Sequence, residues 1–237
     1  MIDINLLKEG KPGFNSKVMV MCFFAVAAMV GLFFYITGND TNSATVNLEA
    51  GIGTNVALVA NPKGGVLTSQ EYQYLVYMRE EEKLARDVYQ FLFQKWQLSI
   101  FYSIAQSEHR HTGSIGSLLQ TYDIADPTLN FGPGEYKNTH ITELYQQLTS
   151  KGQESVLEAL KVGALIEEVD IHDLDLAIQA TDKNDIIMVY SNIRNGSYHH
   201  FRAFVHSIEL YGQPYQAAVL PQKTVDMIVQ SPLLTMP

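Results

Sequence analysis

Apolar side chains recur at steps of three and four residues along four long stretches of this chain, the spacing of one face of an α-helix. The first helix is expected to open at the Ser/Thr-x-x-Glu capping box of residues 68–71. The other three are expected over about 100–122, 153–180 and 183–211, with Gly212 as the stop of the last. No strand-like alternation of any length is present in the sequence. These patterns predict an all-α fold.

A long connection separates the second and third of these helices. It contains the Pro- and Gly-rich run DIADPTLNFGPGEYKN, residues 123–138, and a short helix, ITELYQQLTSKG, that ends at Gly152. Four long helices with a long crossover between helices 2 and 3 predict a four-helix bundle. The tail that follows the fourth helix has a less regular pattern.

The N-terminal part of the chain has a different character. Residues 18–37, VMVMCFFAVAAMVGLFFYIT, carry no charge, and twenty residues at about 1.5 Å each span roughly 30 Å, the thickness of a bilayer core. Lysines precede this run and no Lys or Arg follows it closely. We therefore predict a single-pass anchor in the cytoplasmic membrane with the C-terminal domain extracytoplasmic; a cleaved signal peptide and secretion is the alternative. The expected domains are a cytoplasmic N-terminal segment (1–17), the transmembrane anchor (18–37), a linker (38–66), a helical bundle (67–212) and a C-terminal tail (213–237).

Charge and cysteine content exclude several classes of function. The net charge of −9 and the pI near 5.2 argue against nucleic-acid binding, which needs basic surface to displace counterions. The single cysteine, Cys22, lies in the apolar run and permits neither an intramolecular disulfide nor a thiolate zinc cluster.

Ionisable residues occupy positions on the apolar face of the first helix. Glu82 falls on that face in the run REEEKLARDVY, whereas Glu80 and Glu81 are expected to lie off it. A surface ion pair between Glu82 and Arg86, one helical turn later, is the alternative role for Glu82.

The second helix carries the run QSEHRHTGS. Its Glu108 and His111 are three residues apart, so both side chains lie on one side of the helix, about 5–6 Å apart at Cβ. That is a suitable reach for one metal ion. A lone Glu-x-x-His is a weak motif, and its weight depends on what the other helices offer.

The third and fourth helices add further candidates. Glu167 and Asp170 share one face of the third helix, and Glu168 lies on an adjacent face; both faces contain apolar residues, so periodicity leaves the choice open. A solvated acidic face is the alternative. On the fourth helix, His200 shares a face with Ser197.

Each of the four helices thus offers an acid or an imidazole to the inside. Burying several carboxylates together is very unfavourable unless cations neutralise them. Two divalent metal ions would do so, and carboxylate oxygen with imidazole nitrogen suits iron or manganese. The pattern therefore predicts a metal site, with two iron ions or manganese as the cofactor.

Four motifs carry a resemblance to a known family. EEKLARDVY and SEHRH resemble the first two helices of rubrerythrin-type proteins. MREEEKLARDVY, IAQSEHRHTGSIGSLLQTY, VGALIEEVDIHDL and GSYHHFRAFV together resemble an uncharacterised bacterial and archaeal family of the ferritin-like superfamily, over about residues 70–212. The resemblance implies a ferritin-like di-iron four-helix bundle, in which two helices give a Glu each and two give Glu-x-x-His.

Carried over by position, the resemblance implies metal ligands at Glu82, Glu108, His111, Glu167 and His200. The chain departs from the pattern at Ser197, where the fourth helix should offer a Glu. The residues that could compensate are Glu168, Asp170 and His199. The site otherwise holds one metal, or binds the second one weakly.

Two functions follow from this reading. The first is a membrane-anchored, extracytoplasmic metal-binding protein with oxidoreductase or metal-handling activity, of a ferroxidase or peroxidase kind, with no catalytic residue assigned. Tyr89 could mediate electron transfer or be a core aromatic residue hydrogen-bonded to a carboxylate. The second is a non-catalytic binding or scaffold module with a degenerate metal site. The expected partners are metal ions and the membrane, without nucleic acid; a homodimer stays open and the redox partner is not identified.

Overall fold

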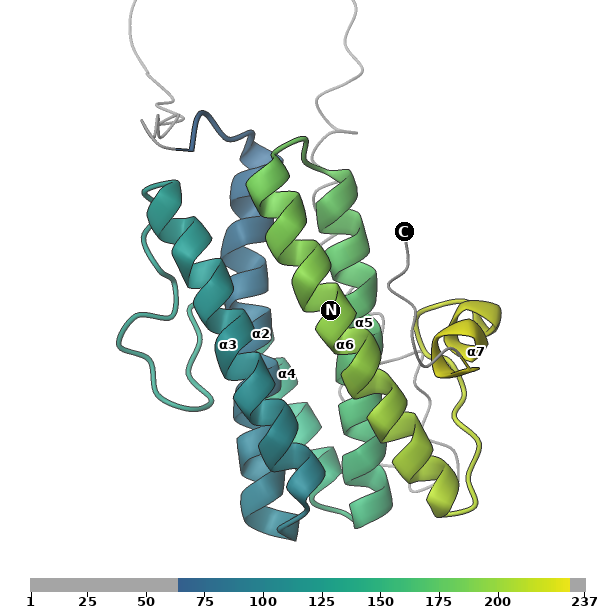
Figure 1. Cartoon of the computed structure of the whole chain (residues 1–237). Coiled ribbons are helices and arrows are strands. Elements are labelled where there is room, and N and C mark those ends of the chain that lie inside the picture. Colours follow the sequence, from purple (N-terminus) through teal and green to yellow (C-terminus); the bar gives the residue numbers. More distant parts are fainter. Residues whose placement is uncertain (1–63, 231–237) are drawn as a thin grey trace, which may run out of the picture. The chain divides into compact units, whose positions relative to one another are not determined.

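The computed structural model describes residues 64–230, which form six α-helices and no β-strand (Figure 1). The all-α prediction is confirmed. The helices are α2 (Ser69–Trp96), α3 (Ser99–Thr121), α4 (Thr139–Gly152), α5 (Val156–Gln179), α6 (Asn184–Leu210) and α7 (Gln222–Gln230). Five of them lie close to the expected positions. The sixth, α7, lies in the tail, where the sequence pattern is less regular and no helix was predicted.

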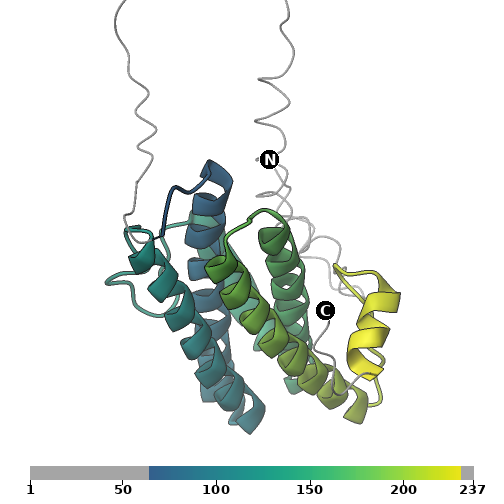
Figure 2. The same ribbon diagram turned by 45° about the horizontal axis from the view of Figure 1, so that its top comes forward.

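The four long helices run side by side (Figures 1 and 2). α2 packs mainly on α3 and α5 mainly on α6, and contacts of α3 with α6 and of α2 with α5 join the two pairs. An aromatic cluster fills one level of this core. The ring centroids of Tyr89 and Phe204 are 5.4 Å apart, and those of Phe101 and Phe204 are 5.7 Å apart. Such rings bury large apolar areas and lock the helices in place.

Local sequence signals set the start of α2. The side chain of Thr68 accepts a hydrogen bond from the backbone nitrogen of Glu71, and the Glu71 carboxylate accepts one from the backbone nitrogen of Thr68. This reciprocal pair satisfies two amide groups that a helix start leaves without partners. The predicted capping box is confirmed.

The anchor predicted over residues 18–37 and most of the linker lie outside the described residues. Among residues 64–230, no helix is long and apolar enough to cross a membrane.

The connection between α3 and α5 is held against α2 by a buried ion pair. Lys83 donates to Asp87 at 2.6 Å and to the carbonyl of Gly132 at 2.7 Å. Asp87 also accepts from the Tyr136 hydroxyl at 3.0 Å and from the Gly134 amide at 3.1 Å. Because both charges are buried and hydrogen-bonded, the pair fixes where the connection lies.

The same face of α2 holds the connection at a second level. Glu80 accepts from the backbone amides of Lys137 and Asn138 at 2.6 and 3.0 Å, and Arg79 donates to the Asp126 carboxylate. Glu80 does lie away from the helix core, as expected, yet it is buried. The reason is that the connection covers it, a long-range contact that helical periodicity does not reveal.

The tail returns to α5 and is held there by Glu168, which is fully buried. The carboxylate accepts from the amides of Ala218, Val219 and Leu220 at 2.7 to 3.0 Å and from the Tyr215 hydroxyl at 2.6 Å. Four donors around one carboxylate form a strong, charge-assisted anchor for the segment that leads into α7.

This arrangement makes Glu168 a stability residue in our first prediction. Glu168→Gln removes the charge and sets an amide donor among backbone donors, so we expect the free energy of unfolding to fall by about 2 kcal/mol, measured by chemical denaturation. Glu154→Gln, which changes an exposed acid, should alter it by less than about 0.5 kcal/mol. Equal stabilities of the Glu168 variant and the wild type would show that the tail is not anchored in this way.

Candidate metal centre

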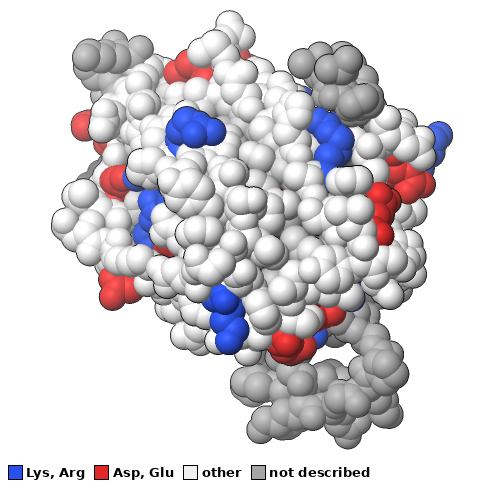
Figure 3. Space-filling view, turned by 60° about the horizontal axis from the view of Figure 1, so that its bottom comes forward, with Lys and Arg blue, Asp and Glu red and all other residues white. Residues whose placement is uncertain are grey.

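The described residues concentrate acidic groups inside the protein. Nine carboxylates and a single lysine, Lys83, are buried. On the face that Figure 3 shows, by contrast, acidic and basic side chains lie scattered among uncharged ones, without a continuous area of one sign. The buried acids are Glu71, Glu80, Glu81, Glu82, Asp87, Glu108, Glu167, Glu168 and Asp170. Glu80, Asp87 and Glu168 accept hydrogen bonds from the connection or the tail. The unusual buried acids are those at the middle of the long helices.

One group of potential ligands joins α2 to α3. The Nδ1 atom of His111 lies 2.8 Å from Glu108 Oε2 and 3.4 Å from Glu82 Oε2. Ligand atoms of all three side chains lie within 4.8 Å of one another, the spacing that one metal ion requires. The i, i+3 spacing of Glu108 and His111 does bring them to the same place, as expected.

A second group joins α3 to α5 and α6. The Nδ1 atom of His200 lies 2.8 Å from Glu108 Oε1 and 3.4 Å from Glu167 Oε2. These three ligand atoms again lie within 4.8 Å of one another. Glu108 therefore belongs to both groups, and it gives one carboxylate oxygen to each. The rings of His111 and His200 stack with their centroids 5.6 Å apart.

Several atoms of the two groups lack hydrogen-bond partners among the described residues. They include both carboxylate oxygens of Glu82, Oε1 of Glu108 and Nδ1 of His200. The short contact of His200 with Glu108 is thus close in distance but lacks hydrogen-bond geometry. Buried polar atoms without partners are rare and need an explanation, and a bound metal ion would be one. The donor set of carboxylates and imidazoles fits iron or manganese.

The arginines that could neutralise these acids lie elsewhere. Arg86 pairs with Asp87 at 2.8 Å rather than with Glu82. Arg110 is exposed, and Arg202 contacts His199 and the carbonyl of Ile228. The surface ion pair considered for Glu82 is therefore not formed. These arginines do not neutralise the negative charges of the two ligand groups.

Without metal, the two imidazoles take the role of cations. Burial lowers the pKa of His111, but the hydrogen bond to Glu108 and the nearby carboxylate of Glu82 outweigh burial and raise that pKa to about 11. Burial also lowers the pKa of His200, but the charges of Glu167 and Glu108 outweigh burial and raise this pKa to about 10. Burial raises the pKa of Glu82, whereas the two histidines together overcome burial and hold the pKa of Glu108 below its usual range.

The structure distinguishes the roles of Glu167 and Glu168, which helical periodicity could not do. Glu167 points toward the cluster and accepts a hydrogen bond from the Tyr89 hydroxyl at 2.6 Å, as one of the two roles expected for Tyr89 requires. Glu168 points to the other side of α5, toward the tail. His199 is exposed on α6. Asp170 is buried and accepts from the Ser197 hydroxyl. Of the predicted site residues, Glu168 and His199 are therefore directed away from the cluster, and Asp170 belongs to neither of the two ligand groups.

Two residues near the site were not predicted from the sequence. A Cβ atom at Gly196 would lie 2.8 Å from the ring of His111, so this glycine leaves the space that the ring occupies. Glu81 is buried with both carboxylate oxygens unpartnered, and burial together with the charges of Asp173 and Asp170 raises its pKa. The only signal in the sequence was its place beside Glu82 in the run REEEK. Helical periodicity put Glu81 off the apolar face of α2. It is buried all the same, because α5 also covers this side of α2.

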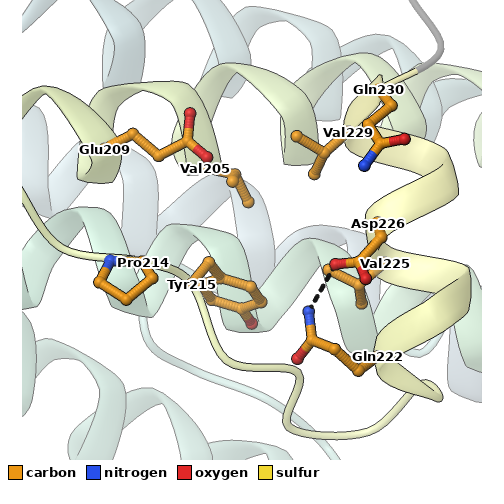
Figure 4. Close-up of a pocket in the computed structure, with 9 residues that line it drawn as sticks. All are labelled: Val205, Glu209, Pro214, Tyr215, Gln222, Val225, Asp226, Val229 and Gln230. Atoms are coloured by element: carbon orange, nitrogen blue, oxygen red, sulfur yellow. Dashed lines mark hydrogen bonds between the residues drawn. The ribbon is translucent and has the colours of Figure 1, made fainter.

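A surface pocket of about 250 Å³ lies apart from the cluster, between α6, α7 and the segment that joins them (Figure 4). Val205, Val225 and Val229 supply apolar walls, and Gln222 donates to Asp226 at 2.9 Å. Gln222 and Asp226 bond to each other, and the Tyr215 hydroxyl donates to Glu168, so these groups do not converge on a ligand. We therefore place the candidate site at the acidic cluster.

Comparisons with known proteins found a matching family model and a relative of known structure. Residues 71–232 match the uncharacterised protein domain DUF2202. The chain is 44% identical over 165 residues to the uncharacterised protein MJ0754 of Methanocaldococcus jannaschii, which covers 70% of this chain and 89% of that protein. The crystal structure of the hypothetical protein MJ0754 from Methanococcus jannaschii is similar with a TM-score of 0.69, covering 70% of this chain and 94% of that one.

The histidine pKa values generate a prediction for the metal-free protein. Between about pH 6.5 and 10 the folded state binds protons on His111 and His200 that the unfolded state releases, so stability is lost as the pH rises. We expect the chelator-treated protein to lose up to about 1 kcal/mol per pH unit for each imidazole, seen as a falling Tm from pH 7 to pH 9. A His111→Gln/His200→Gln variant should show a flatter profile. A Tm that rises over this interval in the wild type would contradict the prediction.

The space that Gly196 leaves for the His111 ring leads to a prediction about metal affinity. Gly196→Ala favours the helix by up to about 1 kcal/mol, yet its methyl group must push the His111 ring aside. We expect unchanged or higher thermal stability together with metal affinity lowered at least several-fold, measured by isothermal titration with Mn²⁺. Gly113→Ala is a matched control on α3, because a Cβ there meets no atom within 4 Å. Equal affinities in both variants would show that the ring position is not critical.

Proposed function

The chain belongs to the family of uncharacterised domains DUF2202, and we propose that it binds divalent metal ions at a two-metal centre inside its helices. The observation that carries the proposal is the sharing of Glu108. Its two oxygens face two separate ligand groups, one completed by Glu82 and His111 and the other by Glu167 and His200. A carboxylate that faces two cations at once is an efficient way to neutralise both.

We also infer that the four long helices form a ferritin-like four-helix bundle. The support is the order of the helices, with the long connection through α4 between α3 and α5. Further support comes from the position of the ligand groups, since α2, α3, α5 and α6 each contribute one or two residues from their middle turns. Glu from two helices, Glu-x-x-His from a third and the histidine of the fourth match the ligand pattern of that fold at five positions.

Iron or manganese held by these residues would supply redox chemistry toward dioxygen, peroxide or a second metal ion. We propose oxidoreductase or metal-handling activity of the ferroxidase or peroxidase kind on that basis. The residues of this chain would orient the ions and exclude water. Tyr89 fixes the rotamer of Glu167 through its 2.6 Å hydrogen bond, and the buried aromatic rings around it keep that side dry.

Metal content tests the proposal. The full chain, purified without chelator in mild detergent and reconstituted with Fe²⁺ without oxygen, should hold close to two metal ions by plasma mass spectrometry. Glu108→Ala should abolish binding of both ions because it removes the shared ligand. His111→Ala and His200→Ala should each lower the content by about one ion.

The chain offers matched controls in the same stretches of sequence. His109→Ala and His199→Ala remove exposed histidines next to the proposed ligands, so they should leave the metal content at the wild-type value. Circular dichroism checks that each variant is folded. A wild-type protein that holds no iron or manganese after reconstitution would sink the proposal and leave a helical binding or scaffold module with a degenerate site.

A further inference from the structure

We propose that Asp170 is a direct ligand of the metal centre and replaces the carboxylate that the fourth helix lacks, with Ser197 as its positioning residue. The inference rests on the proposed function and deepens it. It assigns the carboxylate that completes the centre to α5 instead of α6. The ligand set then consists of Glu82, Glu108, His111, Glu167, Asp170 and His200.

The position of Asp170 on α5 is the first support. Asp170 follows Glu167 by three residues, so both side chains lie on one side of the helix and on adjacent turns. α5 thereby repeats the spacing of Glu108 and His111 on α3. Asp170 is 6% exposed, and Ser197 is fully buried opposite it on α6, one turn before His200.

The hydrogen bonds of Asp170 are the second support. Its Oδ2 atom accepts from the Ser197 hydroxyl, while Oδ1 is buried and has no partner among the described residues. An aspartate with a purely structural role would be expected to have donors on both oxygens. One oxygen held by a serine and the other free is the arrangement of an oriented ligand.

Ser197 on α6 is compatible with a carboxylate supplied from α5. A glutamate at this position would extend into the centre from α6, whereas the side chain of a serine is too short to do so. The serine hydroxyl also lies 3.1 Å from the carbonyl of Ile193, so its rotamer is restricted. It can therefore orient the Asp170 carboxylate without supplying a charge of its own.

The balance of charge is the third support. Glu82, Glu108 and Glu167 carry three negative charges when ionised, and two divalent cations carry four positive ones. With both imidazoles neutral, as metal binding requires, the centre would keep one uncompensated positive charge. Asp170 brings the sum to zero. A buried site strongly favours neutrality, because desolvating a net charge is costly.

Asp170→Asn tests the proposal in the full chain, reconstituted with Mn²⁺ or with Fe²⁺ without oxygen. We expect about one ion per chain where the wild type holds two, or a second ion bound at least about tenfold more weakly. Ser197→Ala should weaken the second ion by a smaller factor. The metal-free Asp170→Asn protein should be as stable as the wild type or more so, because it removes one of several crowded acids.

A rescue variant and a control make the test specific. Asp170→Asn/Ser197→Glu returns a carboxylate to the centre from α6, so it should recover the second ion. Asp175→Asn changes a partly exposed acid on the same helix, paired with Arg194, and should keep both ions. Mn²⁺ electron paramagnetic resonance gives a readout independent of activity, since two neighbouring ions couple magnetically and one does not.

The outcomes separate this inference from the proposed function. A wild type with two ions and an Asp170→Asn protein with two ions of equal affinity would overturn the role of Asp170 alone. Loss of metal-free stability in Asp170→Asn with unchanged metal content would assign Asp170 a structural role and overturn it as well. A wild type without metal would overturn both.

Discussion

The mutual repulsion of buried carboxylates is the constraint on which this structure depends. Glu82 and Glu167 each lie close to Glu108 at the middle of the long helices, and all three carboxylates are buried. Such an arrangement is stable only when positive charge lies among the acids. In the metal-free protein that charge comes from two imidazoles, which is why both have raised pKa values. The proposed metal ions would need the same imidazoles as neutral ligands, so proton and metal would compete for one position.

Helix α2 is surrounded by protein on more than one side, and this explains its unusual run of charges. Glu81 and Glu82 face the other helices, while Glu80 and Lys83 face the connection between α3 and α5. A helix that is buried nearly all round would ordinarily be apolar. Here Glu80 and Lys83 each have specific partners on the connection, so polar residues take over the positioning that apolar packing provides elsewhere.

The sequence predicted the helices well and the site in part. Helical spacing and the capping box at Thr68 located α2 to α6 because these signals are local. Glu108 and His111 could be paired because they lie on one helix. The choice between Glu167 and Glu168 could not be made, since both flanking faces of α5 are apolar and the deciding contacts come from a tail 50 residues away. The burial of Glu80 and the role of Gly196 were missed for the same reason: each depends on an element distant in sequence.

The anchoring of the tail on Glu168 bears on where the folding unit ends. Judged by its long helices, the domain would stop near Gly212, and the remainder would look dispensable. Yet a protein shortened at that point would keep a carboxylate on α5 whose four donors had been cut away, directly beside Glu167, a residue of the proposed metal centre. The family match extends to residue 232, just beyond α7. The inherited unit is therefore the helices together with their tail, and a gene fusion or natural truncation should respect that later boundary.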